Sequence, residues 1–165
     1  MDNDSNIKKA YESILRSDFE QAALWFEQAV AEQPDNAAYH YKLSITYARS
    51  NKLAKAVEHA HKACEISAFD PLYASHLRNL QAKELIQFAE KQMGEGRHEV
   101  AVFKLREATT LDPLATEAHL ILGLAYAHLG QYDEATAAMD EVLRLDPHNE
   151  YANRWIRDYR ANIKQ

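Results

Sequence analysis

Two histidines separated by a single residue, His59 and His61, are the first side chains in this sequence that suggest chemistry, because imidazole is a common metal ligand. They lie in a segment rich in helix-forming residues. On a helix, residues two positions apart point about 200° away from each other, so these two cannot easily share one metal ion. No Asp or Cys cluster stands at zinc spacing. We therefore expect no metal site and no cofactor.

The other candidate groups form no catalytic pattern. The segment Gly94-Glu95-Gly96 lacks the lysine and the preceding strand of a phosphate-binding loop, which favours a break between two helices. No nucleophile motif surrounds any serine. The single cysteine, Cys64, falls on an expected helix, and we interpret it as a small buried thiol rather than a reactive one. The sequence thus predicts a protein that is not an enzyme.

Composition narrows the class of protein and of partner. The 165 residues carry a formal net charge of −6, which argues against nucleic acid or an anionic membrane surface as the main partner. One cysteine cannot form an internal disulfide, which fits a reducing compartment. The polar segment 1–9 lacks the apolar core of a signal peptide, and no run of apolar residues is long enough to span a membrane. We expect a soluble cytoplasmic protein.

The elements that position these residues repeat along the chain. Pro147 follows Pro113 by 34 residues, and Ala56 follows Ala22 by the same interval (147 − 113 and 56 − 22). Strong helix formers dominate the composition, and there are only four Gly and four Pro. A fixed period of this size is typical of stacked supersecondary units rather than of one globular core. The sequence therefore predicts an all-α chain of repeated helix pairs.

The last repeat shows the pattern most clearly. Gly130 breaks a first helix from a second, and Pro147 ends the second because proline cannot continue a helix. The key places hold His119, Leu122, Gly123, Tyr126, Ala135, Met139, Val142 and Pro147. This pattern resembles the tetratricopeptide repeat, with His119 where the family usually has Trp. The resemblance implies a right-handed α-solenoid built from helix-turn-helix units.

The resemblance extends over nearly the whole chain, 1–165, as a single array of about four units and a capping helix. The units are expected at about 3–36, 37–70, 71–115 and 116–149, with the capping helix at 150–164. The interval from Ala56 to Ala101 is 45 residues, and the excess of 11 is about three helical turns. This excess predicts an elongated first helix over about 71–93. A separate short helix with a break near Gln81 is the alternative.

In the tetratricopeptide family, the first helix of each unit lines a concave groove. Carried over by position, the groove would contain apolar and charged residues from every unit. These are Ile7, Tyr11, Tyr41, Lys42, Ile45, Arg49, Lys83, Ile86, Glu90, Leu120 and Leu124. An apolar stripe with a charged rim is typical of a protein-binding site. The alternative is that the stripe is covered internally, by the tail helix, by the long helix or by a second copy of the chain.

The groove residues also predict the kind of partner. The clamp that some family members use for acidic chaperone tails is absent, because Ile7 and Tyr11 replace its first-unit residues and Gln87 replaces an arginine. An amphipathic helix or an extended apolar peptide fits better. We therefore expect a non-catalytic adaptor or scaffold that binds protein, with neither nucleic acid nor membrane as a partner. The alternatives are a self-associating structural protein, with a homodimer left open, and a dedicated chaperone of the type III secretion class.

Overall fold

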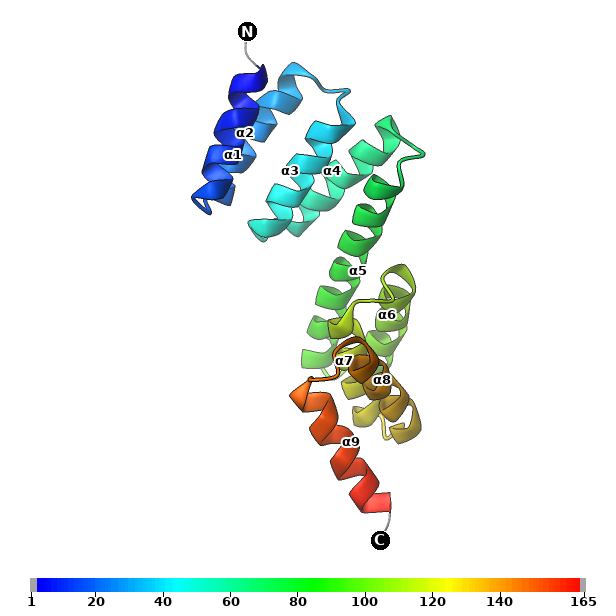
Figure 1. The fold of residues 1–165 in the computed structure, drawn as a ribbon. Helices are drawn as coiled ribbons and strands as arrows, with labels where there is room; N and C mark the ends of the chain where they lie inside the picture. Colours follow the sequence, from blue (N-terminus) through cyan, green and yellow to red (C-terminus); the bar gives the residue numbers. More distant parts are fainter. Residues whose placement is uncertain (1–2, 164–165) are drawn as a thin grey trace. The chain divides into compact units, whose positions relative to one another are not determined.

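The structure is a computed structural model that describes residues 3–163, and side chains from 5 to 159. This part of the chain is entirely helical, without strands, so the all-α prediction is confirmed (Figure 1). The helices are α1 (Asn3–Leu15), α2 (Phe19–Glu32), α3 (Ala37–Arg49), α4 (Leu53–Ile66), α5 (Pro71–Gly94), α6 (His98–Leu111), α7 (Thr116–His128), α8 (Tyr132–Leu145) and α9 (Glu150–Ile163). No helix within 3–163 is both long and apolar enough to cross a membrane.

Short turns separate the two helices of each pair. Ser17, Asn51, Gly96 and Gly130 take positive φ angles between 58° and 73°, and each precedes a new helix by two residues. Asparagine and glycine are among the residues that tolerate this left-handed conformation best. The longer links between pairs hold the helix-breaking prolines. Of these turns, the sequence predicted the two that contain Gly96 and Gly130.

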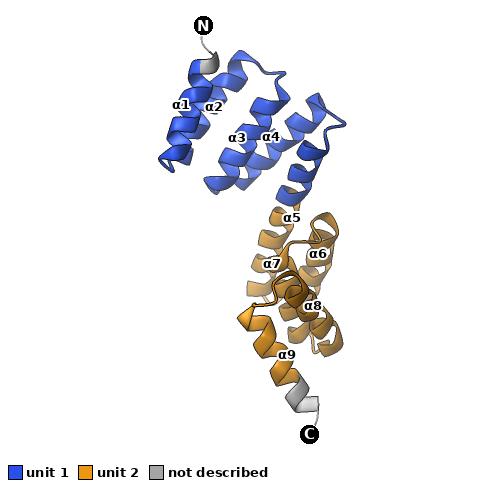
Figure 2. Cartoon of the chain, viewed as in Figure 1, with its two compact units in different colours: residues 1–80 blue, residues 81–165 orange. Residues whose placement is uncertain are grey.

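The chain divides into two compact units, residues 1–80 and 81–165, coloured separately in Figure 2. The two units share one helical plan. Helices α6, α7 and α8 begin and end 79 residues after α2, α3 and α4 (98 − 19, 116 − 37 and 132 − 53). The interval equals one repeat of 34 and one of 45 residues. Every position in one unit therefore has an equivalent in the other, which allows a direct comparison of their packing.

The long helix α5 takes part in both units. It is continuous from Pro71 to Gly94, as the 11-residue excess predicts, and the alternative with a break near Gln81 is wrong. Leu80 is buried in the core of unit 1, and Ala82 is buried in the core of unit 2. The predicted division of 1–165 into one array of four units and a cap stays a prediction.

Small residues allow the helices within each unit to approach closely. Ala22, Ala56 and Ala60 are almost completely buried in unit 1, and Ala56 and Ala60 share a core with Phe26 and Leu43. The fully buried residues of unit 2 at the places of Ala22 and Phe26 are Ala101 and Leu105. Buried apolar surface contributes about 25 cal/mol per Å², so these repeated contacts are the main source of stability.

Helix α9 closes the end of unit 2. Its residues Ala152 and Ile156 are buried against Met139 and Val142 of α8, with Trp155 packed beside them. Without α9, these apolar side chains of α8 would face water. The helix therefore covers the last repeat of its unit, which is the role expected of a capping helix.

Candidate functional site

Ser44 and His76 are hydrogen-bonded to each other in unit 1, but the direction of the hydrogen bond does not suit catalysis. The Ser44 hydroxyl oxygen lies 2.8 Å from His76 Nε2 and 2.6 Å from the carbonyl oxygen of Ala56. A carbonyl can only accept, so the serine donates its single proton to Ala56 and His76 must donate to the serine. A general base would have to accept that proton. Ser44 is also completely buried, so this pair is structural.

A polar cluster occupies the space between α2, α3 and α4. His40 Nδ1 lies 2.9 Å from His59 Nδ1, and His40 Nε2 lies 2.9 Å from the carbonyl oxygen of Pro34. The carbonyl requires Nε2 of His40 to carry a proton, so in the neutral pair Nδ1 of His40 accepts from His59. Burial lowers the pKa of His59, and the adjacent His40 lowers it further.

Tyr47 completes this cluster. Its ring stacks on His59 with centroids 5.6 Å apart, its hydroxyl donates to Glu27, and the Lys55 ammonium lies 5.1 Å from its ring centroid. Burial is the main cause that raises the pKa of Tyr47, and the carboxylate of Glu27 raises this pKa further. The cluster thus joins three helices through satisfied hydrogen bonds.

Among residues 3–163, no three His, Cys, Asp or Glu side chains are grouped so that they could hold a metal ion.

Some predicted groove residues of unit 1 form an aromatic and cationic surface on α1 and α3. Tyr11 is 44% exposed and packs edge-on against Phe26, with ring centroids 5.9 Å apart. The Lys42 ammonium lies 5.4 Å from the Tyr11 ring centroid and 6.0 Å from that of Tyr39. Arg49 lies at the end of α3, over the ring of Phe19 at 5.4 Å. Three predicted residues, Tyr11, Lys42 and Arg49, therefore remain accessible on one unit.

The apolar part of the unit 1 stripe is partly covered by the protein itself. The Tyr41 ring contacts the rings of Tyr73 and His76 on α5, with centroids 5.1 and 5.0 Å apart. Ile7 is half-buried against the core of unit 1, and Ile45 is also half-buried. The sequence pattern placed Tyr41 correctly on the first helix of its unit, but did not show that the beginning of α5 packs against it.

The predicted residues of unit 2 do not form an apolar groove. Ile86 is only 4% exposed and belongs to the core, so its assignment to the groove is corrected. Leu120 and Leu124 are half-buried against the cluster that α8 and α9 form. Lys83 and Glu90 are exposed. Helix α9 and the neighbouring helices thus cover part of the apolar surface that the repeat pattern alone would leave open.

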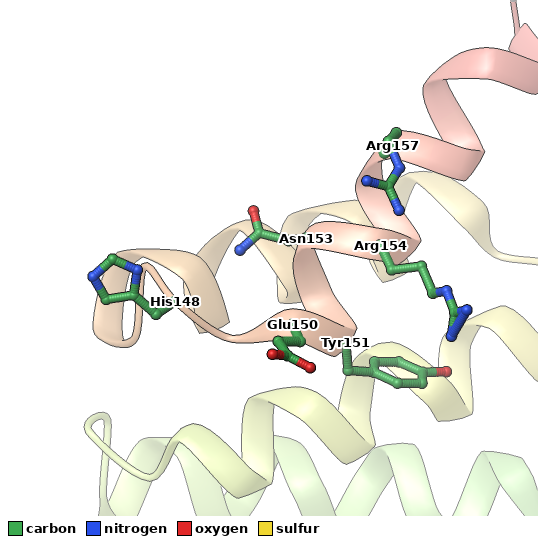
Figure 3. Close-up of a pocket in the computed structure, with 6 residues that line it drawn as sticks. All are labelled: His148, Glu150, Tyr151, Asn153, Arg154 and Arg157. Atoms are coloured by element: carbon green, nitrogen blue, oxygen red, sulfur yellow. The ribbon is translucent and has the colours of Figure 1, made fainter.

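A surface pocket of about 710 Å³ lies beside the start of α9 (Figure 3). Its lining residues are His148, Glu150, Tyr151, Asn153, Arg154 and Arg157. Figure 3 shows that all six come from the link after α8 and the first turns of α9. The Asn153 amide donates to the carbonyl oxygens of Pro147 and Asn149, so it holds the link in place. The lining side chains include no pairing of nucleophile and base. Arg154 and Arg157, three residues apart, are the sequence signal that could have pointed to this pocket.

Solved structures of similar fold were found. MamA from Desulfovibrio magneticus RS-1, from residue 41 to its end, is 16% identical to this chain, with a TM-score of 0.56, and the match covers 93% of this chain and 81% of that one. Another MamA structure is 19% identical, with a TM-score of 0.54 and coverage of 93% and 78%. A tetratricopeptide repeat protein from Parabacteroides merdae ATCC 43184 is 19% identical, with a TM-score of 0.54 and coverage of 97% and 60%. At these identities the similarity shows the fold alone.

The sequence itself identifies the family. No curated protein matches the chain. The family profile described as tetratricopeptide repeat matches residues 16–71 and 87–150, which together make up more than half of the chain. The matched segments contain the helix pairs α3–α4 and α7–α8, whose small and aromatic residues carried the resemblance. This protein therefore belongs to the tetratricopeptide repeat family.

Proposed function

We propose that this protein is a non-catalytic scaffold that binds a segment of another protein on the first-helix face of unit 1. The observation that supports the proposal is the exposed Tyr11 ring beside the Lys42 ammonium, on the α1 and α3 face. An exposed aromatic ring next to a cation supplies both buried area and charge complementarity, and tyrosine and arginine are enriched where proteins bind each other. Arg49 extends this surface along α3.

The partner is an amphipathic helix or an extended segment with apolar side chains. Its apolar residues would pack on Tyr11 and the half-buried Ile7 and Ile45. Lys42 and Arg49 would face carboxylates of the partner, because opposite charges across an interface favour correct pairing. In unit 2, Lys83 and Glu90 remain candidates for a polar rim. This scaffold acts in the cytoplasm, without a cofactor, and its partner is neither nucleic acid nor membrane.

Site-specific photocrosslinking tests the proposal directly. A photoreactive phenylalanine analogue replaces Tyr11 in one variant and Leu24 in another. Leu24 is a matched control, because it is 50% exposed, lies in the same unit and belongs to a second helix. Both variants are irradiated in native lysate, and crosslinked products are identified by mass spectrometry. We expect a defined partner at position 11 that is absent at position 24 and is lost when Lys42→Glu is added.

Two results would count against the proposal. Equal products at both positions would mean that the α1 and α3 face is not selective. A product of twice the mass of the chain, formed from peptides of this protein alone, would favour self-association on the same face. Circular dichroism of each variant verifies that the helices are intact, so a negative result is not caused by unfolding.

A further inference from the structure

A second pocket lies in unit 2, between α6 and α7. Its volume is about 610 Å³. Its lining residues are Phe103, Arg106, Glu107, Thr109, Thr110, Leu122 and Tyr126. The Phe103 ring is 67% exposed, whereas Leu122 is 7% exposed, so the pocket has an open aromatic side and an apolar floor. Neither Phe103 nor Arg106 belongs to the groove that the repeat pattern predicts.

The equivalent place in unit 1 is filled by the protein itself. Tyr47, which stands 79 residues before Tyr126, donates its hydroxyl to Glu27 and stacks on His59. The Lys55 ammonium lies against the same ring. Glu27 comes from α2, and His59 and Lys55 come from α4, so side chains from two neighbouring helices satisfy the tyrosine and occupy the space around it.

Four differences in sequence distinguish this place in unit 2. Glu134 stands where unit 1 has Lys55, and the other three differences leave the place open. Arg106 stands where unit 1 has Glu27, and Ala138 stands where it has His59. Alanine carries no ring that could stack on Tyr126. The acceptor for the tyrosine hydroxyl is also lost, because a guanidinium can only donate. Within the described part of the chain, the Tyr126 hydroxyl forms no hydrogen bond. The third difference places the large Phe103 ring at the position of Leu24.

The pocket also carries an uncompensated positive charge. Glu107 is paired with Lys104 on α6, with 3.0 Å between carboxylate and ammonium. The hydroxyls of Thr109 and Thr110 donate to the backbone carbonyl of Arg106. The guanidinium of Arg106 itself has no hydrogen bond or ion pair with any residue from 5 to 159. An arginine and a tyrosine hydroxyl that both lack partners can bind one carboxylate, and the arginine can do so through two parallel hydrogen bonds.

From this geometry we infer that the pocket binds a protein segment in which an aromatic or aliphatic side chain lies next to a carboxylate. The apolar side chain packs between Phe103 and Leu122. The carboxylate accepts hydrogen bonds from Arg106 and Tyr126. Charge complementarity with the Arg106 guanidinium favours an acidic rather than a basic segment. This site is independent of the face proposed on unit 1.

Peptide selection on the full-length protein tests the inference. A phage library of random dodecapeptides is selected against the whole chain, and synthetic versions of enriched peptides are measured by fluorescence anisotropy. We expect peptides with Asp or Glu within a few residues of Leu, Phe or Trp. Arg106→Glu and Phe103→Ala should each weaken binding by at least about tenfold, since a charge-assisted hydrogen bond and a buried ring each contribute that much.

Matched variants make the outcome decisive. Lys91→Glu changes the charge of the same unit by the same amount, on α5, and should alter binding by no more than about twofold. Arg106 and Phe103 are exposed, so their replacement should leave the fold intact, which circular dichroism verifies. Equal binding to the parent and to Arg106→Glu, selection of basic peptides, or no enrichment would overturn the inference. Loss of binding in Lys42→Glu alone would overturn it too, while supporting the face on unit 1.

Discussion

Replacing Gly123 with serine should destabilise unit 2 by about 1–2 kcal/mol, although serine is the better helix former. A Cβ atom at position 123 would lie 2.8 Å from the terminal methyl of Met139 and 3.4 Å from the carbonyl oxygen of Ala135. The contacted methyl is the flexible end of the Met139 side chain, but Met139 is completely buried, so the contact can be relieved only by repacking within the core. Overpacking of this kind costs about 1–3 kcal/mol, and the gain in helix propensity offsets only about 0.5 kcal/mol.

Unit 1 shows how the substitution can be rescued. Its equivalent residues are Ser44 and Ala60, and the Ser44 hydroxyl donates to the carbonyl oxygen of Ala56. Met139→Ala alone should cost about 2–5 kcal/mol, because it leaves a cavity in the core. In Gly123→Ser/Met139→Ala the serine gains space. The double variant should therefore be more stable than the two single effects imply, by at least about 1 kcal/mol.

The assay measures tryptophan fluorescence, because each unit contains one of the two tryptophans. Trp25 lies on α2 and Trp155 lies on α9, beside the cluster that contains Met139. In a Trp25→Phe background, fluorescence during urea unfolding reports unit 2 alone. The parent, both single variants and the double variant complete the cycle. Additive effects, within about 0.5 kcal/mol, would refute the contact as the cause.

Three other predictions concern the polar cluster and the long helix. Burial lowers the pKa of His59 in the folded chain, so the unfolded chain binds more protons around the ordinary value of about 6.5. The free energy of unfolding should thus fall as the pH drops from about 7 to about 5. The urea midpoint, plotted against pH, should have a shallower slope in His59→Gln than in the parent. Equal slopes would contradict the assignment of this pH dependence to His59. Tyr47→Phe removes the hydrogen bond to Glu27 and should lower the unfolding free energy by about 1 kcal/mol, which thermal melts at constant pH can detect. Gln81→Pro interrupts α5 and should cost about 3 kcal/mol with a loss of helical ellipticity, whereas Gln81→Ala should keep the helical ellipticity; an undisturbed proline variant would mean that α5 is not continuous at this point.

Much of the fold could be predicted from the sequence because the relevant signals are local. Proline excludes a continuing helix, as after α8 at Pro147, and Gly130 takes the left-handed conformation that the turn requires. The 11-residue excess predicted the long α5 because three helical turns keep an apolar stripe on the same face. Each of these conclusions depends on the chain within a few residues, so no neighbour in space was needed.

The candidate site was harder to predict because exposure depends on which helix packs against a residue. Tyr41 and Ile86 occupy the same place in two successive repeats, 45 residues apart, yet rings of α5 cover Tyr41 and the core of unit 2 encloses Ile86. Repeat position gives the direction of a side chain from its helix axis. It does not give the neighbour that the side chain meets, and for Leu120 and Leu124 that neighbour is a cluster completed by α9.

The sequence by itself determined the helical class, the repeat period, the turns and the family, since all follow from residue types at fixed spacing along the chain. The tertiary structure alone decided which surfaces stay open. Tyr47 and Tyr126 occupy the same place in the repeat, but one is closed by Glu27 and His59 from adjacent helices and the other is left in a pocket beside Arg106. The physical reason is that a hydrogen bond or a ring contact needs two groups that the fold, and not the spacing, brings together.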